Sequence, residues 1–129
     1  MTEAKCISYT YEPIGECPNG INQHDPGAKL DKGKVRLSLV FTGMPRAIWK
    51  VAEVLTYGAQ KYSANGWKQV ENGEERYFAA HLRHLLKDCA APDSLDHESM
   101  ILHKAHRLCN DMFELELMLR RSGFELENQ

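Results

Sequence analysis

Three stretches of the chain carry apolar residues at the spacing of an amphipathic helix. The repeat of three or four residues runs through positions 45–62, 75–90 and 96–121. Pro92 ends the second stretch, and Asp96 is a favourable N-cap for the third. The pattern therefore predicts an all-α protein, a helical bundle of three main helices.

The residues before the first predicted helix follow no helical pattern. Residues 1–27 are rich in Gly, Pro and Asn, which predicts an extended and irregular N-terminal arm, whereas residues 28–129 are expected to form one domain. The segment LSLVFTG, residues 37–43, is expected to be a short extended or turn segment. The apolar stripes of the three helices are broader than one chain can cover, which predicts a homo-oligomer.

Composition narrows the class of protein. The chain has 129 residues, of which 43% are hydrophobic and 26% charged, as in ordinary soluble domains. A net charge of −2 gives no whole-chain attraction to nucleic acid or to an anionic membrane. No apolar run approaches the roughly 20 residues of a membrane helix, and the N-terminus lacks a hydrophobic signal core. We therefore expect a cytoplasmic protein.

Histidines at a spacing of three residues are the main chemical signal. His103 and His106 lie in the third predicted helix, and about 100° per residue places them with Asn110 in one 60° sector. The second helix repeats the spacing with His81 and His84. Two side chains so placed can reach one ion or one substrate group. The alternative is that these histidines are ordinary polar residues at a helix interface.

Other residues suggest contacts with an anionic or aromatic ligand. Lysines and Arg36 cluster around two glycines in residues 27–40, which suits either a phosphate grip or a solvated basic loop. Trp67, in a polar loop, is expected either to pack back on the core as a lid or to stack on a base. Asp88 follows His84 by one helical turn and is placed to orient its imidazole. Glu53 is either a functional carboxylate or a surface charge.

Several short motifs occur in an order that resembles a known family. They are KLDKGKVR at 29–36, LTYGAQKY at 55–62, NGW at 65–67, RH at 83–84, DHE at 96–98, HKAH at 103–106 and Asn110. This series, over about residues 27–120, is similar to the phage dATP/dGTP diphosphohydrolase family. The resemblance implies an all-α pyrophosphohydrolase related to MazG-like enzymes. Such enzymes use divalent metal and release pyrophosphate from purine deoxynucleoside triphosphates, here to shape the phage nucleotide pool in the host cytoplasm.

The chain departs from MazG-like enzymes in its metal-binding residues. Those enzymes carry ExxE and ExxD carboxylates for magnesium, whereas the matching helices here carry two histidine pairs. Histidine ligands favour manganese, cobalt, nickel or zinc. Either the histidines hold such a metal, or they contact phosphate and the metal lies on Glu53, Asp88 and Glu98.

These observations give one assignment and two rivals. In the assignment, a divalent cation (Mn, Co, Mg or Zn) is held by His84, Glu98, His103 and His106. The catalytic residues are Glu53, His84 and Glu98. The substrate-binding residues are Lys29, Lys34, Arg36, Lys61 and Arg83 for the phosphates, with Tyr57, Tyr62, Asn65 and Trp67 for base and sugar. The first rival is a non-catalytic protein that sequesters a nucleotide without metal, and the second gives the histidines a purely structural role.

Overall fold

The computed structural model describes residues 16–128, so the predicted arm at residues 1–15 lies outside the described residues. The described part is helical and contains no strand, which confirms the all-α class and the three main helices. Its helices are α1 (Ser38–Gly43), α2 (Pro45–Lys61), α3 (Gly73–Ala90) and α4 (His103–Arg121), with short 3₁₀ helices at Gly66–Gln69 and Leu126–Asn128. Within residues 16–128, no helix has both the length and the apolarity that a membrane crossing requires.

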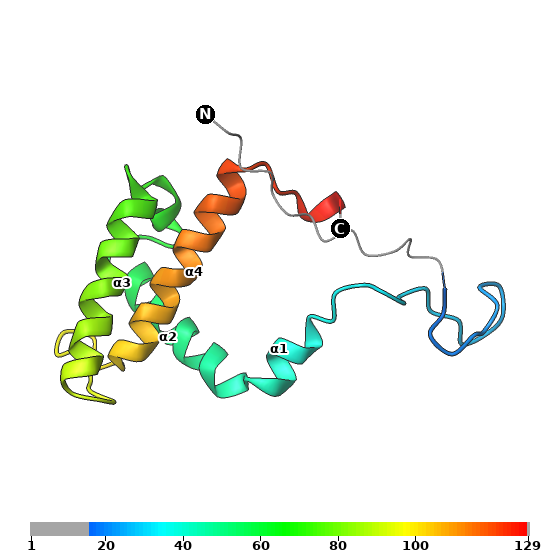
Figure 1. The fold of residues 1–129 in the computed structure, drawn as a ribbon, viewed down its shortest axis with the longest axis horizontal. Helices are drawn as coiled ribbons and strands as arrows, with labels where there is room; N and C mark the ends of the chain where they lie inside the picture. The colour runs from blue at the N-terminus through cyan, green and yellow to red at the C-terminus, as the bar shows by residue number, and fades with distance from the viewer. Residues whose placement is uncertain (1–15, 129) are drawn as a thin grey trace.

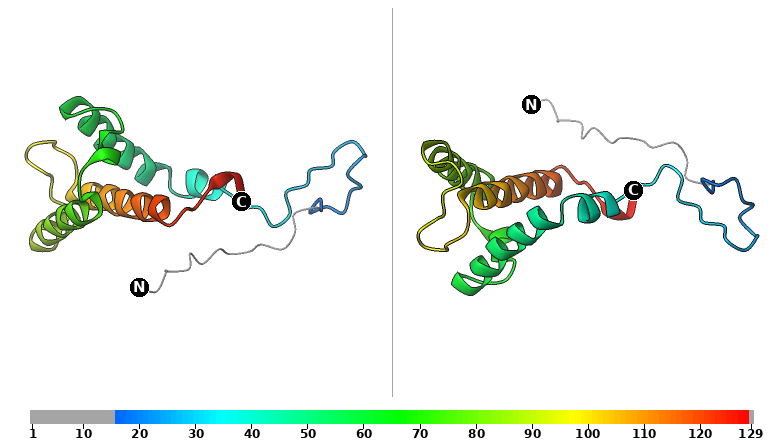
Figure 2. Two further views of the ribbon diagram at one scale, coloured as in Figure 1. Left: turned by 90° about the horizontal axis from the view of Figure 1, so that it is seen from above. Right: turned by 90° about the horizontal axis from the view of Figure 1, so that it is seen from below.

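Helix α4 is the centre of the bundle. It runs antiparallel to α3 and also packs against α2, so that it lies between the two (Figures 1 and 2). Val51 and Val54 of α2 meet Ala105 and Cys109 of α4 in a small buried apolar cluster. Burial raises the pKa of the Cys109 thiol to about 12. The core is therefore a helix interface centred on one face of α4.

The third main helix begins later than its sequence pattern predicts. Asp96 was expected as its N-cap, but α4 starts at His103, and residues 91–102 form a loop. The Asp96 carboxylate instead accepts the backbone N–H groups of Glu98 and Ser99, at 3.1 and 2.9 Å. Aspartate offers the backbone this local turn as an alternative to a helix. A backbone pairing of Leu95 with Leu102 closes the loop.

The expectation of an extended or turn segment at 37–43 was also wrong, because Ser38–Gly43 forms α1. No residue of α1 is buried. Since no neighbouring strand is present in the described chain to satisfy its backbone, local hydrogen bonds such as Met44 N–H to the carbonyl of Val40 do so instead. Helix α1 leads directly into α2, and α1 together with the beginning of α2 projects from the α3–α4 pair (Figure 1).

Trp67 packs back on the helices, which is one of its two expected roles. Its indole stacks on Phe113 of α4, with ring centroids 4.4 Å apart, and Tyr77 of α3 packs against the same phenyl ring at 4.8 Å. Asn65, just before the 3₁₀ helix, has a φ of 58°, a left-handed conformation that asparagine tolerates. The loop that follows α2 is thus fastened to both α3 and α4.

Replacing Trp67→Ala should lower the free energy of unfolding by roughly 2 to 3 kcal/mol, because a half-buried aromatic contact with Phe113 is lost. Urea denaturation followed by circular dichroism measures the change. The matched control is Trp49→Ala on α2, where the side chain is 69% exposed and a change within about 0.5 kcal/mol is expected. Equal effects of the two substitutions would show that the stacking on Phe113 contributes nothing.

Candidate functional site

Three histidines from two helices converge at the end of the bundle near the 91–102 loop. His84 Nδ1 on α3 lies 2.8 Å from His103 Nδ1 on α4, and the His84 ring stacks on His106 at 4.6 Å between centroids. His103 and His106 are 5% and 8% exposed. The i, i+3 spacing on α4 turns both imidazoles toward α3, where the antiparallel packing brings His84 between them.

The 91–102 loop adds a carboxylate and a hydroxyl to this histidine cluster. Oxygen and nitrogen atoms of Asp96, His84 and His103 lie within 4.8 Å of one another, close enough to hold one cation. Ser99 Oγ is hydrogen-bonded to His106 Nε2 at 2.6 Å. Sequence reasoning missed Asp96 as a possible ligand, because it was expected to cap a helix rather than a turn beside the histidines.

Two side chains of helix α2 contact Glu98, a residue of the 91–102 loop beside the histidine cluster. The Tyr57 hydroxyl donates to the Glu98 carboxylate at 2.6 Å, and the Lys61 ammonium donates to the same oxygen. Tyr57 also stands edge-on to His106, with ring centroids 6.5 Å apart. Three predicted site residues, Tyr57, Lys61 and Glu98, therefore meet beside the predicted histidines.

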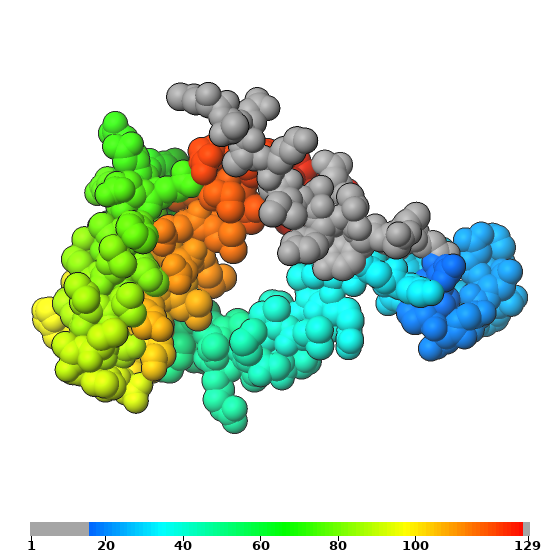
Figure 3. All heavy atoms as spheres, in the orientation of Figure 1, coloured from blue at the N-terminus to red at the C-terminus, as the bar shows by residue number. Residues whose placement is uncertain are grey.

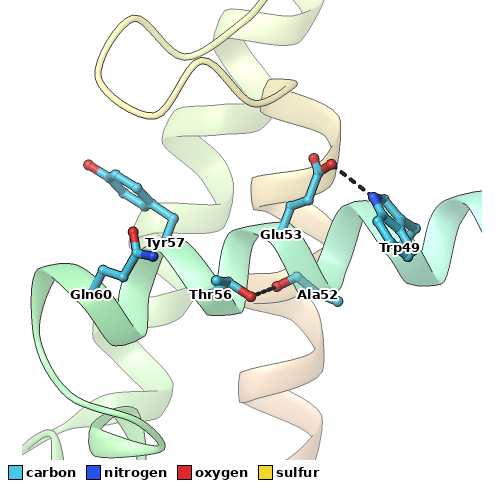
Figure 4. A pocket seen from close by; sticks show the side chains of 6 residues that line it. All are labelled: Trp49, Ala52, Glu53, Thr56, Tyr57 and Gln60. Carbon is cyan, nitrogen blue, oxygen red and sulfur yellow. Dashed lines mark hydrogen bonds between the residues drawn. The ribbon is translucent and has the colours of Figure 1, made fainter.

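A shallow pocket of about 350 Å³ lies along α2 next to Tyr57. Figure 4 shows its lining side chains, which are Trp49, Ala52, Glu53, Thr56, Tyr57 and Gln60. The Glu53 carboxylate accepts hydrogen bonds from the Trp49 indole at 3.0 Å and from Lys50 at 2.9 Å. Glu53 and Tyr57 thus line one pocket, and Tyr57 also contacts Glu98 and His106.

Other predicted site residues lie elsewhere. Arg83 is exposed on α3, and Tyr62 is exposed after α2, where its ring lies near Lys61. The segment that carries Lys29, Lys34 and Arg36 runs from α1 away from α3 and α4 (Figure 1). Trp67 and Asn65 lie in the loop after α2, where the Trp67 indole packs on Phe113 of α4.

Asp88 does not orient His84, in contrast to the expectation from their spacing. Its buried carboxylate accepts the backbone N–H of Asp93 at 3.1 Å and the Arg107 guanidinium at 3.4 Å. The hydrogen-bond partner of His84 Nδ1 is His103. Asp88 therefore fixes the start of the 91–102 loop, because an aspartate at the last turn of a helix reaches the freed backbone that follows.

A second cluster of ionisable side chains lies further along the α3–α4 pair. It consists of His81, Asp111 and Glu114, with His81 Nδ1 3.2 Å from the Asp111 carboxylate and 3.0 Å from the Arg107 carbonyl. Within the described residues, Glu114 Oε2 is buried without a hydrogen-bond partner. Burial, and then the charge of Asp111, raise the pKa of Glu114. The i, i+3 spacing of Asp111 and Glu114 was the signal that sequence reasoning missed.

Burial and repulsion between neighbouring imidazoles lower the pKa of two histidines in the cluster, His84 and His106. Burial first, and then the charges of His106 and His103, lower the pKa of His84 to about 4. Burial also lowers the pKa of His106. Hydrogen bonds from Lys61 and Tyr57 lower the pKa of Glu98 and keep it ionised. Near pH 7, neutral His84 and His106 therefore lie beside the ionised Glu98, and neutral imidazole and carboxylate are the forms in which these groups bind metal ions.

A family model described as dATP/dGTP diphosphohydrolase, N-terminal, matches residues 24–127. The chain belongs to this family. No curated protein and no solved structure matches the chain. The family match confirms the resemblance of the ordered motifs, and it spans all four α-helices as well as the histidine cluster. The name of the dATP/dGTP diphosphohydrolase family describes a hydrolase that acts on purine deoxynucleotides.

The donor atoms of this dATP/dGTP diphosphohydrolase family member suit a divalent cation. One ion that binds two imidazole nitrogens at about 2.1 Å holds them roughly 3 Å apart. The His84 and His103 nitrogens are already 2.8 Å apart, and a carboxylate of Asp96 lies beside them. Two imidazoles and one carboxylate favour Mn, Co, Fe or Zn over Mg.

The free energy of unfolding should decrease as the pH falls from about 6.5 toward 4. Unfolded histidine binds a proton near pH 6.5, whereas folded His84 stays neutral down to about pH 4, so acid favours the unfolded chain. Urea titrations at pH 7.5, 5.5 and 4.5 in the presence of a chelator measure this dependence. His84→Asn should make it shallower, and an unchanged slope would contradict the prediction.

Proposed function

We propose that this protein hydrolyses purine deoxynucleoside triphosphates, dATP and dGTP, to the monophosphate and pyrophosphate. The observation that carries the proposal is the meeting of His84, His103 and Asp96 beside the Glu98–Tyr57–Lys61 group. The match to the dATP/dGTP diphosphohydrolase family supports the substrate class. The reaction would take place where α2, α4 and the 91–102 loop adjoin.

A divalent cation would be held by His84, His103 and Asp96, and not by Glu98 as the motifs alone implied. Glu98 is less suited as a ligand because its carboxylate is already hydrogen-bonded to Tyr57 and Lys61. His106 is hydrogen-bonded to Ser99 and would orient the cluster. When bound, such a cation offsets phosphate charge and lowers the pKa of a water molecule.

Glu98 is the proposed general base. Lys61 and Tyr57 lower its pKa, so the carboxylate is ionised near pH 7, and its side chain is 55% exposed. A water molecule attacks the α-phosphorus, and its proton passes to the Glu98 carboxylate. The bond from the α-phosphorus to the bridging oxygen breaks, and pyrophosphate leaves. Lys61, next to Glu98, stabilises the negative charge that develops on the phosphate oxygens.

The pocket on α2 is the proposed site for the base. Trp49 offers an exposed indole at its rim, and an aromatic face can stack on any base. Gln60 and Thr56 supply polar groups that can hydrogen-bond to the base or sugar. Trp49 thereby takes the stacking role considered for Trp67, whose indole is occupied by Phe113.

The decisive experiment is a turnover screen of each deoxynucleoside triphosphate with Mg²⁺, Mn²⁺, Co²⁺ or Zn²⁺, with products separated by chromatography. Monophosphate and pyrophosphate from dATP or dGTP are expected. Nucleoside with tripolyphosphate would instead mean that the attack point is wrong. A thermal shift with nucleotide, but no turnover with any metal, would favour the non-catalytic nucleotide-binding protein.

Replacing both His103→Ala and His106→Ala should abolish turnover, by a factor of at least about 10³, because the cation site and its orienting residue are lost. Circular dichroism should show unchanged helicity. The matched control is His97→Ala, an exposed histidine in the 91–102 loop, which should keep full activity. Full activity in the double variant would remove the histidine cluster from the mechanism.

Replacing Glu98→Gln should lower kcat by about 10² to 10⁴, the range for loss of a general base. KM and the amount of bound metal should stay nearly unchanged, since the proposed ligands remain. Steady-state kinetics and metal analysis of the purified variant separate these quantities. A loss of metal together with activity would make Glu98 a ligand instead.

A further inference from the structure

An apolar surface surrounds α1 and has no partner in the described chain. Six large side chains, between 42% and 67% exposed, form it: Val35, Leu37, Leu39, Val40, Phe41 and Met44. Figure 3 shows open space between α1 and α4. Monomeric soluble proteins rarely expose contiguous apolar patches of more than a few hundred Å². We call these six residues the α1 patch.

Most of the basic side chains that precede α1 have no carboxylate partner among residues 16–128. Within the described residues, Lys32 pairs with Glu16, but no ion pair involves the side chains of Lys29, Lys34 or Arg36. The segment that carries them leads away from the α3–α4 pair of its own chain (Figure 1). Three cations without an ion pair in the described chain therefore adjoin the α1 patch, on a segment that runs away from the site in the same subunit (Figure 1).

The cations that lie nearest to the proposed active site are each already paired with a carboxylate of the same chain. Lys61 is paired with Glu98, and Arg107 with Asp88. Lys104 is paired with Asp93 and lies 3.9 Å from Asp88. One divalent cation offsets only part of the charge of a triphosphate. Arg83 and Lys87, exposed on the neighbouring face of α3, are the rival source of positive charge in the same chain.

We propose that a second copy of this chain covers the α1 patch, and that Lys34 and Arg36 of each copy bind the triphosphate in the site of the other. The proposal rests on the proposed function. Each chain carries both complementary parts, a basic segment and a site with exposed carboxylates such as Glu98. A two-fold symmetric dimer pairs the parts twice, so that two identical shared sites form.

The dimensions of the chain allow this arrangement. With α1 patches packed against each other, a basic segment must pass the first turns of the partner's α2 to reach its pocket. Pro45 to Glu53 spans about 12 Å of helix at 1.5 Å per residue. Lys34 lies four residues before α1 begins at Ser38, so an extended backbone carries it about 13 Å beyond that helix at 3.3 Å per residue. A stable interface needs roughly 800 Å² from each partner, a requirement that six exposed large side chains and the adjoining segment can meet.

Light scattering after size exclusion tests the surface. The wild-type mass should be about twice the 14.7 kDa of the chain, and Phe41→Glu should return it to the monomer value. The matched control is Leu86→Glu on α3, equally apolar and 69% exposed, which should leave the dimer intact. A monomeric wild type overturns the proposal, and so does a dimer that Leu86→Glu breaks and Phe41→Glu does not.

Mixing two inactive variants tests the shared site. One variant carries Lys34→Ala with Arg36→Ala, and the other carries His103→Gln. When the two are unfolded and refolded together in equal amounts, half of the dimers are mixed, and each mixed dimer has one intact site. About a quarter of wild-type activity should return. Activity no higher than that of either variant alone would place the basic segment in its own chain's site and overturn the proposal.

The affinity for tripolyphosphate, measured by calorimetry, tests the shared site even if the protein shows no turnover. Lys34→Ala with Arg36→Ala should weaken binding at least about tenfold, because two charge-assisted contacts are lost. Phe41→Glu should weaken it by the same factor, since the monomer has no partner segment. A monomeric variant that binds tripolyphosphate as tightly as the wild type would overturn the proposal. Absence of turnover in the wild type would contradict the proposed function alone.

Discussion

The antiparallel contact between α3 and α4 is the constraint on which the structure depends. This contact places His84 Nδ1 2.8 Å from His103 Nδ1. On an adjoining face of α4, Ala105 and Cys109 pack against α2. The residues of the core and those of the site therefore alternate along one helix. A shift of α4 by one turn along α3 would separate the imidazoles of His84 and His103. The same shift would remove Ala105 and Cys109 from their contacts with α2.

Much of the helical layout follows from the sequence, because it depends on local periodicity. The bounds of α2 and α3 agree with the apolar repeat to within two residues. The start of α4 could not be predicted in the same way, because an aspartate caps a helix or a turn with similar preference. The backbone pairing of Leu95 with Leu102 accompanies the turn in this structure. That contact depends on where the loop closes, which no local pattern records.

The residues of the candidate site likewise include some that the sequence predicts and others that it does not. Helical spacing predicts that His103 and His106 share a face, but their meeting with His84 depends on the register between two helices. Asp96 was not predicted as a ligand, because its place beside the histidines follows from the shape of the loop. The cluster of His81, Asp111 and Glu114 needs the same register before its members come together. Spacing within one helix is legible in a sequence, whereas the register between helices is set by packing.

Because the apolar core is small, a cation bound at the histidine cluster would also affect the stability of the fold. Few apolar side chains are buried among the described residues, whereas His84, Asp96 and His103 belong to two helices and the loop between them. A cation bound to all three would join these segments and stabilise the folded state in proportion to its free concentration. Unfolded chains are the ones that proteases degrade. The amount of this protein in a cell would then follow the supply of its metal, because scarcity would shorten the protein's lifetime as well as reduce its activity.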